Sequence, residues 1–161
     1  LTAFADRLAP GGVLALLEGG LPTRWLPRDI GFGRPGLQSR LDAIEEDWFA
    51  EMRAALPGTE QVTEDWPALL TDAGLRHGGT RSFLLDLAAP LHPDTRTHAV
   101  DVFTRRRESL AGQLAADDLA ALDRLLDPDD PQGLMVRPDV FVLGAQTVHL
   151  GVKPDTVAPD A

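Results

Sequence analysis

The sequence predicts an α/β fold, because segments with helical periodicity alternate with short apolar segments typical of strands. Five consecutive apolar residues at 13–17 predict a strand that is buried on both faces of a sheet. An amphipathic helix is predicted over residues 37–56, where apolar side chains recur every three or four positions (Leu37, Leu41, Ile44, Trp48, Met52 and Leu56). Of the 161 residues, 43% are apolar and 25% are charged, which favours one globular domain.

The segments before residue 37 predict a short helix, a strand and a loop. Helical spacing over residues 1–8 stops at 10–12, where a proline and two glycines cannot prolong a helix. We expect the strand at 13–17 to close at Glu18-Gly19-Gly20. Residues 21–36 carry three prolines and three glycines and therefore predict a long loop.

After the helix at 37–56, a second helix is predicted over 66–73. Asp65 can cap its first amides, Pro67 suits its first turn, and Gly74 suits its C-terminal cap. The remaining patterns predict a strand at 80–87, a helix at 94–114 capped by Asp94, a helix at 117–126, a last strand over 140–148 and an unstructured tail at 154–161.

Composition excludes several classes of function. The net charge of −10, from 25 acidic and 15 basic residues, disfavours nucleic acid and anionic membranes as partners. The absence of cysteine excludes disulfides and thiolate metal sites. The longest apolar segment is far shorter than a membrane span, and no secretory signal is recognisable, so we expect a cytoplasmic protein. Arginine greatly outnumbers lysine, which indicates a GC-rich bacterial genome.

Two segments carry a resemblance to a known family. Residues 8–18 (LAPGGVLALLE) resemble the L-x-P-G-G-x-L-x-x-x-E segment of class I S-adenosylmethionine-dependent methyltransferases, in which a helix turns into the fifth strand. Residues 66–75 (WPALLTDAGL) are similar to the family's next helix and the Ala-Gly step before its sixth strand. The strand at 141–148 resembles the seventh strand, which the family inserts antiparallel between the fifth and the sixth. The resemblance covers about residues 1–150.

This resemblance implies the C-terminal half of a Rossmann-like methyltransferase sheet, namely its last three strands, with helical insertions that form a substrate cap. The partial domain would span 1–153: a helix and the fifth strand in 1–20, cap insertions at 21–60 and 90–138, and the last strand at 139–149. The implied activity is methyl transfer from S-adenosylmethionine to a small-molecule acceptor.

In the family, a glycine-rich loop and an acidic ribose contact of the N-terminal half hold the cofactor. This sequence contains neither, so it assigns no cofactor-binding residue. We expect the N-terminal half of the same domain to be the main partner of this chain. A homodimer is compatible with the sequence. We expect the isolated chain to be inactive.

The candidate acceptor-binding residues follow from their positions. Ligands of open α/β sheets bind beyond the carboxyl ends of the strands, where Glu18 either contacts the acceptor or caps the adjacent turn. Aromatic side chains of the first insertion can line an apolar acceptor pocket, and its arginines can pair with an acidic group of the acceptor (Trp25, Phe32, Phe49, Arg24 and Arg28). Trp48 lies on the helix stripe and is expected in the core.

His98 is the candidate catalytic base, because imidazole titrates near neutral pH, and the alternative is a solvated helix position. His92, Asp94 and His98 fit no standard ligand spacing, so no metal site is expected. The run Arg105-Arg106-Arg107 predicts a solvent-facing helix surface.

Two further functional interpretations stay open. One is a non-catalytic interaction module on a degenerate α/β scaffold. The other is a nicotinamide-dependent enzyme, because residues 31–36 match G-x-G-x-x-G. The segment before this match carries three charges and a proline, which does not suit a buried parallel strand, so we favour a lid loop.

Overall fold

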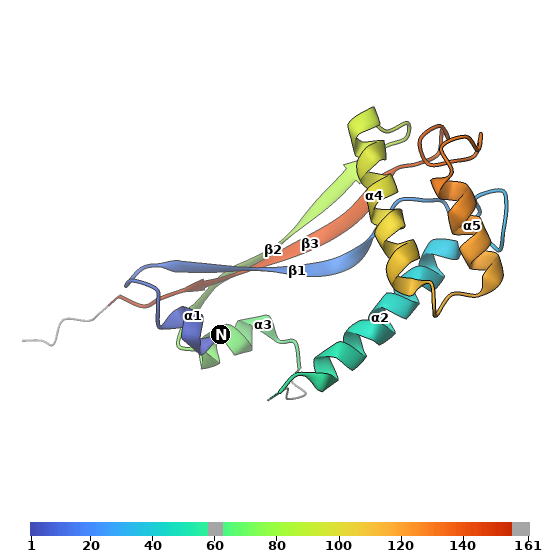
Figure 1. Cartoon of the computed structure of the whole chain (residues 1–161). Helices are drawn as coiled ribbons and strands as arrows, with labels where there is room; N and C mark the ends of the chain where they lie inside the picture. The colour runs from blue at the N-terminus through green and yellow to red at the C-terminus, as the bar shows by residue number, and fades with distance from the viewer. Residues whose placement is uncertain (58–62, 156–161) are drawn as a thin grey trace, which may run out of the picture. The chain divides into compact units, whose positions relative to one another are not determined.

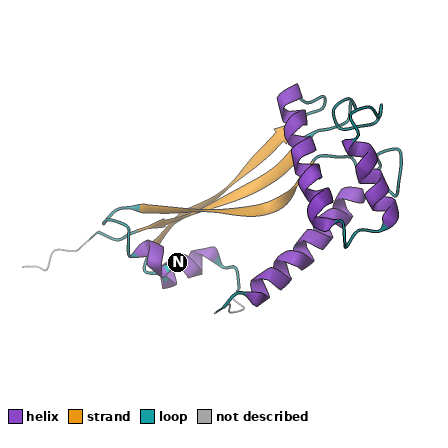
Figure 2. Cartoon of the chain, in the orientation of Figure 1, coloured by secondary structure: helices purple, strands orange, loops and turns teal. Residues whose placement is uncertain are grey.

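The computed structural model describes residues 1–57 and 63–155 (Figure 1). Helices and strands alternate along these ranges, which confirms the α/β class (Figure 2). Most of the predicted tail lies outside the described residues. The elements are α1 (Thr2–Ala5), β1 (Val13–Arg24), α2 (Leu37–Ala55), α3 (Trp66–Asp72), β2 (Arg76–Leu87), α4 (Pro93–Leu110), α5 (Ala116–Leu126) and β3 (Val142–Val152).

The three described strands form one antiparallel sheet in the order β1-β3-β2. The start of β1 pairs with the end of β3, because the amide of Lys153 donates to the carbonyl of Gly12 at 2.8 Å. At the opposite ends, the amide of Phe141 donates to the carbonyl of Trp25 at 3.1 Å. The last strand therefore lies between the two earlier ones, which is the order that the resemblance implies.

The first strand differs from its prediction in length and in burial. β1 does not close at Glu18-Gly19-Gly20 but continues to Arg24. It is also not buried on both faces in the described chain, because Val13 and Leu17 are 55% and 62% exposed. Leu14 and Leu16 point the other way and pack against a small cluster from α1 and α3. Because side chains alternate along a strand, helices on one side of the sheet bury only every second residue.

The chain divides into two compact units, each with its own core. The first unit comprises residues 1–21, 60–84 and 145–161, and the second comprises 22–59 and 85–144. The two stretches of the second unit overlap the segments 21–60 and 90–138, and the second stretch extends beyond 90–138 at both ends.

The first unit surrounds a small cluster formed by Ala5, Leu70 and Leu75. Its helix α3 begins as predicted, because the Asp65 carboxylate accepts a hydrogen bond from the amide of Ala68 at 3.1 Å. Gly74 follows the helix with φ +80°, a conformation that glycine adopts without a steric penalty. Local capping chemistry therefore determines both ends of this helix.

The second unit packs α4 against both α2 and α5. Phe103 of α4, Leu41 of α2 and Leu122 of α5 are fully buried in its core. Helix α4 begins one residue earlier than predicted, and its N-cap is His92, whose ring nitrogen accepts from the amide of Asp94 at 3.3 Å. Asp94 is therefore a first-turn residue and not the cap.

Candidate functional site

The second unit contains a cavity of about 670 Å³ between α2, α4 and the end of β1. This volume lies within the range of pockets that bind small organic molecules. The lining combines aromatic, acidic and basic side chains from the end of β1, the residue after it and the two helices (Trp25, Asp42, Glu45, Glu46, Trp48, Phe49, His98 and Arg106 among them). The second unit therefore offers a concave site with both apolar and ionisable walls.

Three aromatic residues form one wall of the cavity. Trp25 is 6% exposed, whereas Trp48 and Phe49 of α2 are 53% and 46% exposed. Two adjacent exposed aromatic side chains that both line a cavity are a candidate ligand-binding surface. Trp48 is thus a lining residue and not the core residue that its place on the helix stripe predicts, because the apolar stripe of α2 extends beyond the part that α4 covers.

Arg106 forms ion pairs with two acidic side chains of the site, Asp42 and Glu45. Its Nη2 donates to Asp42 Oδ1 at 2.9 Å and to Glu45 Oε2 at 2.7 Å. The Arg106 side chain is only 14% exposed, so the prediction of a solvent-facing position is wrong for this member of the run. Its Nη1 is buried and has no hydrogen-bond partner among the described residues. Asp42 and Glu45 are three positions apart on α2 and therefore present their carboxylates on the same side.

The carboxylate of Glu46, unlike those of Asp42 and Glu45, is not paired with Arg106. It is exposed, it lines the cavity, and it makes no ion pair or hydrogen bond with any residue that the structure describes. The site therefore holds two carboxylates that share one guanidinium and a third that is open to a ligand.

Three of the predicted site residues meet at the cavity: Trp25, Phe49 and His98. The His98 ring lies edge-on to the Trp25 ring, with centroids 5.6 Å apart and an interplanar angle of 62°. His98 is exposed, so a small molecule in the cavity can reach its imidazole. The sequence had no signal for Arg106, whose burial depends on α2 residues about sixty positions away.

The other predicted site residues do not line this cavity. Arg24 donates to the Ser39 hydroxyl at 2.9 Å, and Arg28 is exposed on the loop that follows β1. Phe32 packs against the core of the second unit, where the Arg124 guanidinium lies 4.2 Å from the centre of its ring. Glu18 is a half-buried residue of β1 in the first unit.

The glycine-rich loop at 31–36 is filled by the protein's own side chains. Arg40 donates to the carbonyls of Arg34 and Pro35 and makes a two-point contact with Asp118, at 2.8 and 2.6 Å. Gly33 has φ +62°, and an added Cβ would lie 3.1 Å from the Cβ of Ala121. Gly33 therefore serves the packing of this loop on α5, which supports the interpretation as a structural loop over a phosphate-binding one.

The Arg40 hydrogen bond holds the pKa of Asp118 below its ordinary value of 3.8 and outweighs the effect of burial. The same bond raises the pKa of Arg40. This pair is therefore charged throughout the physiological pH range, and it anchors the loop to α5.

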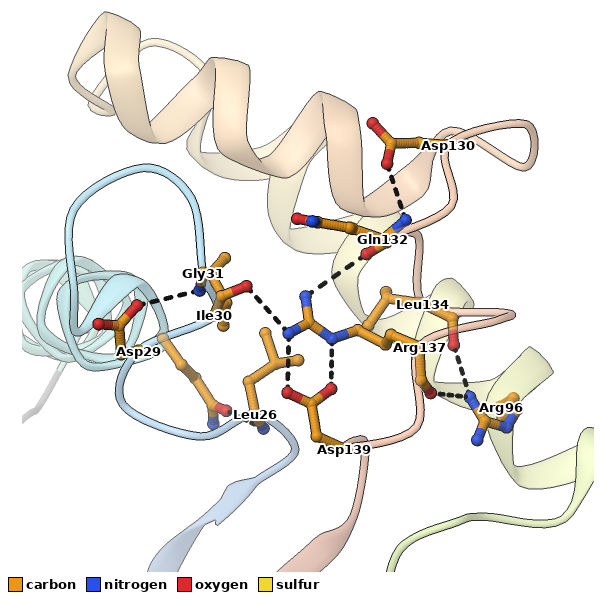
Figure 3. A network of polar contacts seen from close by, with 11 residues as sticks. Leu26, Asp29, Ile30, Gly31, Arg96, Asp130, Gln132, Leu134, Arg137 and Asp139 are labelled. Atoms are coloured by element: carbon orange, nitrogen blue, oxygen red, sulfur yellow. Dashed lines mark hydrogen bonds and ion pairs between the residues drawn. The ribbon is translucent and has the colours of Figure 1, made fainter.

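A second arginine network connects loops of the second unit to α4 (Figure 3). Arg96 donates to the carbonyls of Leu91, Leu134 and Arg137, at distances from 2.7 to 3.2 Å. Arg137 in turn donates to the carbonyl of Ile30 at 3.1 Å and to both carboxylate oxygens of Asp139 at 2.6 and 2.9 Å. The Arg137 hydrogen bond lowers the pKa of Asp139. These contacts satisfy buried backbone carbonyls of loops, so we interpret the network as structural.

Among the described residues, no three histidine, aspartate or glutamate side chains converge as metal ligands. No helix of the described ranges is both long and apolar enough to cross a bilayer.

No protein-family model, curated protein or solved structure matches this chain.

Proposed function

We propose that this chain is the acceptor-side part of an S-adenosylmethionine-dependent methyltransferase that acts on a small molecule, and that the acceptor binds in the cavity of the second unit. The observation that carries the proposal is the convergence of Trp25, Phe49 and His98 on a cavity of suitable volume. The resemblance of residues 8–18 and 66–75 to the methyltransferase family supplies the reaction class.

The cavity residues have separable roles in this proposal. The aromatic wall of Trp25, Trp48 and Phe49 binds the acceptor and excludes water from it. His98 takes up the proton of an acceptor group that has to lose one, because its imidazole faces the same space. The remaining contribution is positioning, which alone accounts for a large part of the rate in a displacement reaction.

The described residues do not form a site that fits S-adenosylmethionine. The glycine-rich loop that would be the obvious candidate is occupied by Arg34 and Arg40 and closed against Asp118. We therefore assign S-adenosylmethionine to the N-terminal half of the same domain. The exposed apolar face of β1 supports such a partner, because Val13, Leu17 and Leu21 are all more than half exposed.

The exposed face of β1 also favours the second interpretation, an interaction module without catalysis. Apolar side chains on a strand at the edge of a sheet are a common site for binding another protein segment. The two functions differ in whether a cofactor is bound by the assembled protein.

Calorimetry with S-adenosylhomocysteine separates these functions. We expect no binding to the 161-residue chain, but binding and transfer of a labelled methyl group by the natural gene product that contains it. Binding to the 161-residue chain alone would contradict the assignment of the cofactor to the other half. A gene product that binds no S-adenosylhomocysteine would contradict the methyltransferase proposal and leave the interaction module.

A further inference from the structure

We infer that the cavity of the second unit selects a ligand with a protonated amine on an apolar or aromatic body. If this ligand is the methyl acceptor, the inference rests on the proposed function and narrows its substrate class to amines.

The formal charge of the cavity wall is negative. Asp42, Glu45 and Glu46 contribute three carboxylates, and Arg106 contributes one guanidinium. Arg106 contacts the first two carboxylates at 2.9 and 2.7 Å and so offsets only part of their charge. Glu46 has no partner in the described chain. A cation in the cavity would therefore lie in an attractive potential and could pair with an open carboxylate.

The aromatic wall favours the same charge. The face of an indole or phenyl ring attracts a cation through its quadrupole, and tryptophan does so most strongly. Trp48 and Phe49 are adjacent residues of α2, next in sequence to the segment that carries the acidic side chains, and Trp25 closes the space from the end of β1. The Arg53 guanidinium already lies 5.8 Å from the centre of the Phe49 ring, so the exposed indole of Trp48 is the main aromatic surface for a ligand cation. This indole and the carboxylates of the same cavity form the combination that recognises an ammonium group attached to an apolar body.

An anionic ligand is the main competing possibility, because Arg106 could pair with a carboxylate. The geometry opposes this possibility. The Nη2 atom of Arg106 is already shared by Asp42 and Glu45, and its unpaired Nη1 is buried beneath the surface. An anion would reach Arg106 only by displacing these carboxylates, and it would still face Glu46.

Three probes of similar size test the inference on the 161-residue chain: 2-phenylethylammonium, 2-phenylethanol and 3-phenylpropanoate. Titrations are followed by calorimetry and by tryptophan fluorescence, since Trp25 and Trp48 line the cavity. We expect the ammonium to bind at least about tenfold more tightly than the alcohol, and the carboxylate to bind more weakly than both. Added salt should reduce only the advantage of the ammonium.

Variants locate the binding in the cavity. Glu46→Gln should weaken ammonium binding about three- to tenfold and leave alcohol binding unchanged, because it removes only charge. Trp48→Leu keeps an apolar surface but removes the π face, so it should weaken the ammonium more than the alcohol. Asp47→Asn is the matched control, because Asp47 is an exposed neighbour on α2 that does not line the cavity, and it should change neither affinity.

The inference is overturned if the carboxylate binds as tightly as the ammonium, if all three probes bind equally, or if none binds at about 10 mM. It is also overturned if Asp47→Asn weakens ammonium binding as much as Glu46→Gln does. Its failure is distinguishable from failure of the proposed function. If the gene product binds amines but transfers no methyl group, only the proposed methyltransferase activity is contradicted. If it transfers a methyl group to an acceptor that has no amine, only the inferred selectivity for amines is contradicted.

Discussion

The two units differ in how completely they bury their apolar side chains. In the described chain, the second unit places fifteen residues in one continuous buried cluster, whereas the cluster of the first unit comprises Ala5, Leu70 and Leu75. The first unit also leaves Val13, Leu17 and Leu21 of β1 more than half exposed. Because buried apolar area is the main source of stability, the second unit has the internal core of an independent domain and the first unit does not.

Because the two units differ in burial, they are suited to different tasks. A well-packed unit can hold a binding cavity at fixed geometry, which suits the walls formed by α2 and α4. A sheet with an uncovered apolar face is suited to association with another segment.

Phe103→Ala should have the largest effect on stability. Phe103 is fully buried in the core of the second unit, and removing a buried phenylalanine side chain costs about 3–5 kcal/mol of unfolding free energy. Phe83→Ala is the matched control, because Phe83 is 50% exposed on β2, and its cost should be about 0.5 kcal/mol or less. Urea unfolding combined with hydrogen exchange measures both changes. Equal costs would contradict the proposed difference in packing.

Asp118→Asn should destabilise the second unit by about 2 kcal/mol, because it removes the charged partner of Arg40 and Arg34. Asp117→Asn is the control, since Asp117 is half exposed, forms an ion pair with Arg34 and accepts a hydrogen bond from the Asp118 amide that asparagine can also accept, so its cost should be below about 1 kcal/mol. Thermal unfolding of the two variants at neutral pH gives the comparison. Similar melting temperatures would show that the buried pair contributes no more than the exposed one.

The same pair predicts a dependence of stability on pH. The pKa of Asp118 is lower in the folded state than its ordinary value of 3.8, so its contribution is complete above that value and is lost as the pH falls through the folded pKa. Between about pH 5 and the acid limit of folding, the wild-type second unit should lose more stability than Asp118→Asn does. If the unfolding free energies of the wild type and of Asp118→Asn fall equally as the pH is lowered, the contribution assigned to Asp118 is contradicted.

Gly33→Ala should cost about 1–2 kcal/mol, because alanine is strained at φ +62° and its Cβ would press against Ala121. Gly112→Ala is the comparison, since an added Cβ there meets nothing within 4 Å, and it should be neutral or slightly stabilising. Chemical unfolding measures both. A Gly33→Ala protein of unchanged stability would remove the structural explanation for the glycine-rich loop and reopen its interpretation as a ligand loop.

Leu17→Thr should have the smallest effect. Leu17 is 62% exposed, and threonine has a high strand propensity, so the unfolding free energy of the 161-residue chain should change by less than about 0.5 kcal/mol. The same change should weaken any association that uses this face, which sedimentation of the gene product can detect. A large loss of stability in the 161-residue chain would show that the face is already covered.

Local chemistry made much of this fold predictable from sequence. The cap at Asp65, the C-terminal glycine at Gly74 and the apolar stripe of α2 each act within a few residues, and the structure contains α2 and α3 where these signals place them. The continuation of β1 through Gly19-Gly20 was not predictable in this way, because it depends on pairing with β3, more than a hundred residues later.

The candidate site shows the same division between local and distant causes. Trp25, Phe49 and His98 could be selected from residue type and position, and they meet at the cavity. Arg106 could not be distinguished from Arg105 and Arg107 within its charge run. Only the approach of Asp42 and Glu45 on α2 makes one of the three a buried partner.

The position of β3 has a consequence for how the chain acquires its structure during synthesis. Among the described strands, β3 comes last in the sequence and lies between the other two, so neither β1 nor β2 can pair with β3 until translation has passed residue 152. Strand pairs of such long sequence separation form slowly, because closing the large loop between them costs conformational entropy before any stabilising contact has formed. The helical core of the second unit needs no such delay, and we expect it to be protected first in pulse-labelled refolding, with the sheet following.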